Sequence, residues 1–226
     1  MSFGPIISTK TSTGLQIELA PFTREEVVQF VDGLQTASVT RFVGLPAMTS
    51  ELEQEWYDKK IKEVNSILWG VWTIENDKRV LVGSTAINDI GPHVPTQRNI
   101  TQGTTAIVLT CRGYWGKGIA SAAHSARTWY AFRQHGLVRL KSAVAQTNHA
   151  SRRALEKVGY SHIFTERNFQ FIDGQYVHED NFECLNPDDW AWRLWWGGDR
   201  PTKKAVEARV KTIEVLSLAE KKVKLL

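Results

Sequence analysis

The sequence predicts a mixed α/β fold, an α+β arrangement in which helices flank a mostly antiparallel sheet with one splayed parallel pair of strands. Two apolar, β-prone segments joined by a short polar turn are typical of antiparallel neighbours. Further along the chain, strands alternate with helices, and such crossovers place strands parallel. At 226 residues, of which 42% are hydrophobic, the chain is long enough to bury one good core.

The N-terminal part predicts a strand followed by two helices. Residues 15–19 (LQIEL) alternate apolar and polar side chains, as a half-buried strand does. Thr23 and Glu26 have the spacing of a capping box, which starts a helix. Ser50 and Glu53 repeat this spacing, and an approximately helical apolar pattern predicts a second helix that continues to about residue 65.

The central segments ILWGVWTIE and RVLVGSTAI are expected to pair as a hairpin through Asn76-Asp77-Lys78. Residues 89–103 (DIGPHVPTQRNITQG) contain Gly and Pro without periodicity, which predicts a surface loop that covers a site.

The second half of the chain predicts alternating strands and helices. Strands are expected at 104–110, 137–145 and 160–166, and helices at 119–134 and 148–157. Gly136 and Gly159 follow the two helices, at the position where a left-handed residue ends a helix. A last hairpin is expected to turn at Asp173-Gly174.

The composition changes after Pro187, and we predict a domain over residues 1–186 followed by a Trp-rich extension over residues 187–226. Four tryptophans fall within seven residues of this extension: Trp190, Trp192, Trp195 and Trp196. They either line a pocket or anchor the extension, and anchoring is favoured because large aromatics dominate core and interface burial. A helical face is then predicted from Val206, Val210, Ile213, Leu216, Val223 and Leu226. We expect it to pack on the domain or on a second subunit.

Several function classes are disfavoured by composition. The net charge is +4, with 24 acidic residues interspersed among 28 basic ones, so a nucleic-acid partner is not expected. Segments long enough to span a membrane and a signal peptide are absent from the sequence, which predicts a soluble, cytoplasmic protein without a membrane partner. Cys111 and Cys184 are far apart and lack clustered His partners, so neither a disulfide nor a metal site is predicted.

The segment YWGKGIA, residues 114–120, is the first candidate for chemistry. It is not a P-loop, because Cys111 stands where the first glycine belongs and Gly118 replaces Ser or Thr after the lysine. The dinucleotide fingerprint also fails, since Ser121 occupies its third glycine position. What is left is a pair of glycines before a helix N-terminus, where backbone N–H groups can bind an anion such as a diphosphate. The alternative is a plain chain reversal.

The second candidate is NHASRRALEKVGY, residues 148–160. Asn148 lies at a strand-to-helix junction, with Ser151 three residues on. Two neighbouring strands that each end at a helix can splay and leave a slot for an extended ligand, and Asn148 offers a donor and an acceptor to amides there. Its alternative role is a helix N-cap.

Together the two motifs resemble the GCN5-related N-acetyltransferase (GNAT) superfamily, whose acetyl-CoA motif is [QR]-x-x-G-x-[GA]. Trp115-Gly-Lys-Gly118-Ile-Ala120 aligns with that motif, and Trp115 replaces its leading Gln or Arg. This replacement and the second motif are similar to the RimJ/RimL-like subgroup, the ribosomal-protein alanine N-acetyltransferase type. The resemblance implies the GNAT acyl-CoA N-acyltransferase fold, acetyl-CoA as co-substrate and no metal.

The resemblance also implies roles for individual residues. Backbone N–H groups of the loop would bind the CoA pyrophosphate, the strand end would pair with the pantetheine amides, Asn148 would contact the pantetheine arm, and Ser151 would replace a catalytic Tyr whose position holds Leu155. The implied catalytic residues are Ser151 and Asn148. The implied CoA-binding residues are Leu109, Thr110, Trp115, Gly116, Lys117, Gly118, Ile119, Ala120, Asn148 and Ser151.

The general base is not evident from the sequence. Positions where the subgroup often has acidic residues hold Thr104, Thr105 and Ala122, and the candidates by placement are Asp89, His93 and Asp180. A lysine amine, with pKa about 10.4, needs a base more than an α-amine with pKa about 8. The missing base therefore favours an α-amine acceptor.

These observations predict an N-acetyltransferase that moves the acetyl group of acetyl-CoA to a primary amine by direct attack, with a protein or peptide N-terminus as acceptor and possible homodimerisation. One alternative acceptor is a small amine: an aminoglycoside, a polyamine or an amino acid. Acidic residues in the loop at 91–103 would indicate a polycation, and an open groove would indicate a peptide. A non-catalytic acyl-CoA-binding module is a further alternative, and a nucleic-acid binder ranks last.

Overall fold

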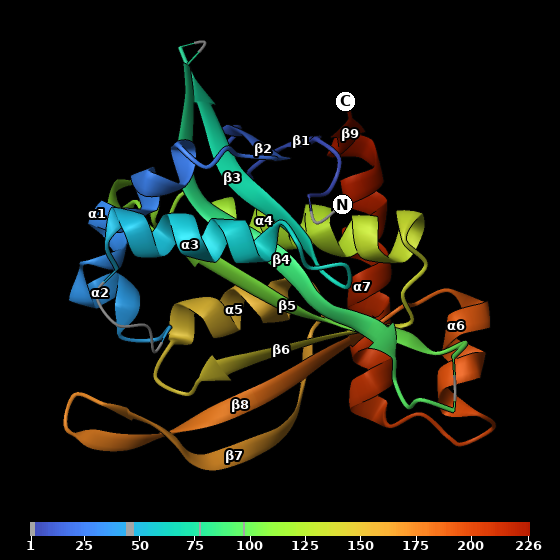
Figure 1. The fold of residues 1–226 in the computed structure, drawn as a ribbon. Coiled ribbons are helices and arrows are strands. Elements are labelled where there is room, and N and C mark those ends of the chain that lie inside the picture. The colour runs from blue at the N-terminus through green and yellow to red at the C-terminus, as the bar shows by residue number, and fades with distance from the viewer. Residues whose placement is uncertain (1–2, 44–47, 77, 97) are drawn as a thin grey trace. The chain divides into compact units, whose positions relative to one another are not determined.

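The computed structural model describes residues 3–43, 48–76, 78–96 and 98–226 (Figure 1). The chain forms two compact units. The first contains Met1–Asn88, Ala106–Ala123 and Lys222–Leu226, and the second contains Asp89–Thr105 and His124–Lys221. Asp77 of the predicted hairpin turn and Gln97 of the predicted loop lie outside the described residues.

The first unit holds a sheet with the strand order β5-β4-β3-β2-β1-β9. Its strands are β1 (Ile7–Lys10), β2 (Gln16–Ala20), β3 (Ile67–Glu75), β4 (Lys78–Pro92), β9 (Lys224–Leu225) and the end of β5 (Thr101–Leu109). β3 pairs antiparallel with β2 and β4, which confirms the predicted hairpin. β1 and β9 were not predicted, because each is short and carries little sequence pattern.

Short helices cover part of this sheet: η1 (Glu26–Phe30), α1 (Val31–Leu34), α2 (Ala37–Thr40) and α3 (Ser50–Lys60). The predicted capping box is present, since the Thr23 N–H donates to Glu26 Oε2 over 2.8 Å and the Glu26 N–H donates to Thr23 Oγ1 over 3.2 Å. An apolar cluster joins these helices to the strands, and it includes Phe22, Phe30, Leu68, Trp72 and Leu81.

The second unit holds the strand order β7-β8-β6-β5. β6 (Arg139–Ala145) pairs parallel with β5 through residues 102–104 and antiparallel with β8 (Gln175–Leu185), which pairs antiparallel with β7 (Ser161–Ile172). The predicted mixed sheet with one parallel pair is therefore confirmed. Asp173 and Gly174 turn the last hairpin with φ values of 51° and 80°, as a tight hairpin turn requires.

The remaining helices are α4 (Ile119–Trp129), which continues as the π-helix η3 (Tyr130–Gln134), α5 (His149–Lys157), α6 (Asp189–Trp196) and α7 (Lys203–Lys222). Gly136 and Gly159 have φ values of 69° and 95°. Both predicted glycine stops are confirmed, because only glycine adopts this backbone conformation without steric cost.

Two predicted boundaries were wrong. The N-cap of α3 is Thr49, whose extended backbone lets its side chain accept from the Leu52 N–H, and not Ser50; the helix ends at Lys60 rather than near residue 65. Both ends of the predicted loop at 89–103 are strand, since β4 continues to Pro92 and β5 begins at Thr101. Hydrogen bonding across the connection, from the His93 N–H to the Ile100 carbonyl over 2.7 Å, extends the pairing.

The apolar face predicted for α7 is buried only in part within this chain. Val206, Val210 and Ile213 are 44–53% exposed, whereas Thr212, Leu216 and Ala219 are buried. A β-carbon on Gly159 would lie only 2.2 Å from Thr212 Oγ1, so α7 approaches its own unit through a side with small side chains. Leu216 of the predicted face is buried as expected, and close approach of the helix buries Thr212 beside it.

The tryptophans of α6 have unequal environments. Ala191 is buried with Ile100 and Val138, and the half-buried Leu194 and Trp195 pack on this cluster. The Trp195 ring also lies 5.1 Å from the His93 ring and 4.9 Å from the Arg139 guanidinium. These contacts support the anchoring interpretation for Trp195.

Candidate active site

The glycine loop lies in the first unit, between the end of β5 and the start of α4. Gly116 and Gly118 have φ values of 76° and 80°. Among the described residues of this loop, no hydrogen bond is recorded for the backbone N–H groups of residues 116–120. A loop with two left-handed glycines and unpaired N–H groups, next to the N-terminus of an eleven-residue helix, has the geometry of an anion nest.

The side chains of the loop surround this nest with positive charge. Arg112 lies 5.8 Å from the Trp115 ring centroid, and the Lys117 ammonium lies 4.5 Å from the Tyr114 ring centroid. Trp115 is partly exposed, and its Nε1–H donates to the Leu109 carbonyl over 3.0 Å. The indole is thereby fixed against the strand end, which holds the loop conformation.

Two predicted CoA-binding residues use backbone groups inside the protein. The Leu109 carbonyl accepts from Trp115, and the Thr110 N–H donates to the Val82 carbonyl over 2.9 Å. Thr110 is buried, and its carbonyl oxygen would lie 2.4 Å from a β-carbon on Gly33. These particular groups already have partners at the end of β5.

Asn148 and Ser151 lie in the second unit, at the start of α5. Asn148 Oδ1 accepts from the Ser151 N–H over 3.1 Å, so Asn148 is the N-cap that the alternative interpretation described. For the Asn148 amide nitrogen and the half-buried Ser151 hydroxyl, both among the described residues, no partner is recorded. Leu155 is fully buried, so this position of α5 belongs to the core.

Asp180, a candidate base, is the centre of a polar cluster in the second unit. Its carboxylate accepts from Gln146 Nε2 over 3.0 Å, from Thr165 Oγ1 over 2.7 Å and from the Arg152 guanidinium over 2.8 Å. Although burial of Asp180 opposes ionisation, these hydrogen bonds and the nearby positive charges hold its pKa below the ordinary value. A carboxylate of low pKa with three donors is a poor base, and it ties the start of α5 to the strands.

The other candidate bases have different surroundings. His93 Nδ1 lies 3.2 Å from Gln102 Oε1, and its ring packs on Trp195. Asp89 is exposed, with a φ of 52°. Thr105, at a position where an acid was sought, is buried, donates to the Lys141 carbonyl over 3.0 Å and lies 3.3 Å from the Tyr160 hydroxyl. Each of these residues therefore has contacts consistent with a structural or surface role.

Glu53 is a residue that sequence reasoning misinterpreted. Its spacing from Ser50 suggested a capping role, yet the N-cap is Thr49 and only 4% of Glu53 is exposed. Desolvation raises the pKa of its carboxyl to about 7. An acid in the middle of a helical apolar pattern is the signal that could have indicated burial.

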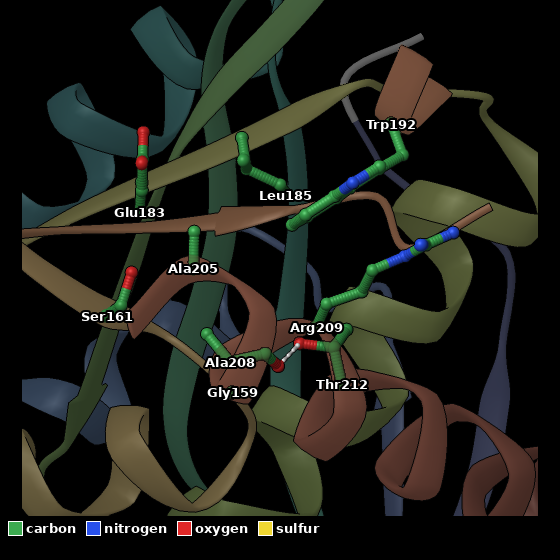
Figure 2. Close-up of a pocket in the computed structure, with 9 residues that line it drawn as sticks. All are labelled: Gly159, Ser161, Glu183, Leu185, Trp192, Ala205, Ala208, Arg209 and Thr212. Carbon is green, nitrogen blue, oxygen red and sulfur yellow. Dashed lines mark hydrogen bonds between the residues drawn. The ribbon is translucent and has the colours of Figure 1, made fainter. Parts of the chain in front are cut away.

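A crevice in the second unit lies between α7, the start of β7 and the end of β8 (Figure 2). Its empty volume is about 240 Å³, including space open to solvent. Three of its polar groups already have partners: Thr212 Oγ1 donates to the Ala208 carbonyl (Figure 2), Arg209 donates to the Pro187 carbonyl, and Glu183 pairs with Arg139. The crevice is a packing feature of α7 rather than a candidate acceptor site.

Within residues 3–43, 48–76, 78–96 and 98–226, no group of three or more His, Cys, Asp or Glu side chains is arranged to hold a metal ion. In the same ranges, no helix combines the length and apolar character needed to cross a membrane. Cys111 and Cys184 are both free thiols.

Comparison with known families and structures identifies similar proteins. Residues 16–161 match the family described as "Acetyltransferase (GNAT) domain". A search of curated proteins found no match.

Solved structures with similar folds include three acetyltransferases. Spermidine N-acetyltransferase from Vibrio cholerae, in complex with CoA and spermine, is 16% identical with a TM-score of 0.65, over 75% of this chain and 95% of that one. RimJ from Mycobacterium smegmatis, in complex with CoA-disulfide, is 16% identical with a TM-score of 0.65, over 86% and 95%. Ribosomal-protein-S5-alanine acetyltransferase from Vibrio fischeri is 17% identical with a TM-score of 0.61, over 81% and 98%.

Proposed function

The chain belongs to the GNAT acetyltransferase family, and we propose that it transfers the acetyl group of acetyl-CoA to the α-amine of a protein or peptide N-terminus. As a member of this family it is an acetyl-CoA-dependent acyltransferase. The observation that carries the proposal is the glycine loop, whose left-handed Gly116 and Gly118 leave a run of N–H groups unpaired before α4.

The proposed roles follow from the donors that each segment offers. The N–H groups of residues 116–120 bind the diphosphate of CoA, and Lys117 adds a positive charge. The Asn148 amide nitrogen donates to the pantetheine arm while Oδ1 caps α5. The Ser151 hydroxyl hydrogen-bonds the thiol that leaves.

The acetyl transfer requires little of the protein beyond positioning the thioester and the amine. Acetyl-CoA supplies a thioester carbonyl that a neutral amine can attack directly. A Ser151 hydroxyl held at the start of α5 can donate a hydrogen bond to sulfur as negative charge develops there. An α-amine, with pKa about 8, is already partly neutral near pH 7, so the acceptor does not depend on a strong base. Asp180, whose carboxylate accepts hydrogen bonds from Arg152 and Thr165, is therefore not needed as a base.

The acceptor is proposed from charge. Between Gly91 and Gly103 the sequence has His93 and Arg98 and neither Asp nor Glu. A polycation would be recognised by acidic side chains, which this loop does not offer. A polyamine acceptor nevertheless remains the second candidate, because the fold is similar to that of the V. cholerae spermidine N-acetyltransferase. The same proposal includes four further expectations. The domain ends at residue 186 and the extension begins at residue 187, the protein forms a homodimer, its specificity is RimJ/RimL-like, and its location is cytoplasmic.

Release of free thiol from acetyl-CoA tests the function, with α-amino peptides, polyamines, aminoglycosides and amino acids as acceptors. We expect turnover with peptides that have a free α-amine and none with the same peptides after N-terminal acetylation. Turnover confined to polyamines would replace the proposed acceptor. CoA binding without turnover for any amine would favour a non-catalytic acyl-CoA-binding module.

Two variants test the roles in the second unit. Ser151→Ala is expected to lower kcat, and Asn148→Ala is expected to raise KM for acetyl-CoA and to weaken α5 by about 1 kcal/mol through loss of the cap. Ser217→Ala, at an exposed position of α7, is the matched control. Unchanged kcat and KM in both variants would contradict the assigned roles.

A further inference from the structure

The turn that joins β1 to β2 lies beside the glycine loop within the first unit. A β-carbon placed on Gly118 would lie 3.4 Å from Ser12 Oγ, 3.6 Å from Thr11 Cβ and 4.0 Å from the Ser12 nitrogen. These separations are ordinary van der Waals contacts. The tip of the turn therefore lies beside the residue that immediately precedes α4, with room between them for about one methyl group.

Hydrogen bonds to Thr11 hold this turn in one conformation. The Thr11 N–H donates to the Leu15 carbonyl over 2.9 Å, and the Gly14 N–H donates to the Thr11 carbonyl over 3.1 Å. The Thr11 hydroxyl accepts from the Leu15 N–H over 3.1 Å and lies 2.9 Å from the Thr13 hydroxyl. Since Thr11 is buried, the turn is a fixed support, and a ligand that binds there does not need to order it.

Ser12 is the residue of this turn that offers unused donors. It is exposed, and among the described residues neither its hydroxyl nor its backbone N–H has a recorded hydrogen-bond partner. Both groups lie beside a loop whose own N–H groups are also unpaired. A hydroxyl and an amide at this distance from Gly118 can reach the same anion as the loop, because a diphosphate presents several oxygen acceptors.

We propose that Ser12 is a phosphate-binding residue of this acetyltransferase, and that its hydroxyl donates to a diphosphate oxygen of CoA beside the N–H groups of residues 116–120. The inference rests on the proposed function, since it takes CoA as the ligand of the loop. It extends the anion site to a segment more than one hundred residues away in the sequence. Hydrogen bonds to charged acceptors are the stronger ones, so one hydroxyl has a measurable effect.

Binding of CoA and dephospho-CoA, measured by titration calorimetry on the full chain, tests the proposal. We expect Ser12→Ala to weaken the affinity for both ligands by about tenfold, because both carry the diphosphate. Ser12→Thr keeps the hydroxyl and is expected to bind like the unaltered protein. Thr13→Val, which removes the neighbouring exposed hydroxyl and its hydrogen bond to Thr11, is the control for the conformation of the turn and is expected to change the affinity less than Ser12→Ala does.

The outcomes separate this inference from the proposed function. If the unaltered protein does not bind CoA, the proposed function itself fails. If it binds CoA and Ser12→Ala binds equally well, Ser12 only packs against Gly118, and the inference is overturned while the function stands. A loss confined to CoA would assign Ser12 to the 3′-phosphate, and an equal loss in Thr13→Val would assign the effect to the turn; either result also overturns the inference.

Discussion

Alanine at Gly116 tests whether the left-handed backbone of the loop binds the ligand. The loop offers a graded series of glycines. Gly113 does not have a positive φ and would contact nothing within 4 Å as alanine. Gly116 has a φ of 76° with the same open space, and Gly118 combines a φ of 80° with the contact to Ser12. Only the backbone conformation therefore distinguishes Gly116→Ala from Gly113→Ala.

The magnitude follows from the cost of a left-handed conformation for alanine, about 1–2 kcal/mol. If the loop keeps its conformation, this cost lowers the free energy of unfolding. If the loop relaxes, the nest is lost, and the affinity for CoA falls by about 5- to 30-fold, at 1.4 kcal/mol for each factor of ten. The sum of the two losses, expressed as free energies, is expected to be about 1–2 kcal/mol.

Urea unfolding and titration calorimetry with CoA measure the two parts. We expect Gly113→Ala to be close to the unaltered protein in both assays, and Gly118→Ala to lose at least as much as Gly116→Ala. The reasoning would be refuted by a Gly116→Ala variant with unchanged stability and affinity. It would equally be refuted if Gly113→Ala lost as much as Gly116→Ala.

Three further predictions concern side chains away from the loop. Burial raises the folded-state pKa of Glu53 to about 7 from 4.5, so its contribution to stability is full below pH 4.5 and is lost as the pH rises through 7. In urea unfolding at pH 8, Glu53→Gln should therefore be more stable than the unaltered protein by about 1–3 kcal/mol, a range reduced for water around the charged group. At pH 4 the two proteins should be about equally stable. For Asp180, whose folded-state pKa is lowered, Asp180→Asn should lower the free energy of unfolding by about 1.5–3 kcal/mol at pH 7, and this difference should shrink in acid as the carboxylate of the unaltered protein becomes protonated. Trp195→Ala should lower the free energy of unfolding by about 3 kcal/mol and leave KM for the acceptor unchanged, as an anchor would; an increase in KM would instead support a role in an acceptor pocket.

Local sequence signals predicted much of the fold. The Thr23 and Glu26 capping box, the Asp173-Gly174 turn and the Gly159 helix stop each depend on residues within one turn of chain, and all three are confirmed. The glycine loop belongs to the same class. Its two left-handed residues follow from the spacing of Gly116 and Gly118, because glycine adopts such conformations without steric cost.

Tertiary packing determined which side chains are buried, and the hydrophobic pattern of the sequence did not predict this fully. Within this chain the apolar stripe of α7 is buried at Leu216 and exposed at Val206, Val210 and Ile213, and Thr212 is the residue that lies close to Gly159. Glu53 is buried although its spacing from Ser50 has the form of a capping box. Periodicity identifies an apolar side of a helix, but the space that a neighbouring segment leaves determines which side fits.

The sequence by itself determined the mixed fold, the order of the central strands and helices, and the two motifs that resemble the GNAT superfamily, since each depends on residues close together in the chain. Only the tertiary structure decided which donors are unused. It paired the Leu109 carbonyl with Trp115, surrounded Asp180 with three donors and placed Ser12 against Gly118. Ser12 and Gly118 are far apart in the sequence, and their proximity results from the tertiary fold, which no local pattern contains.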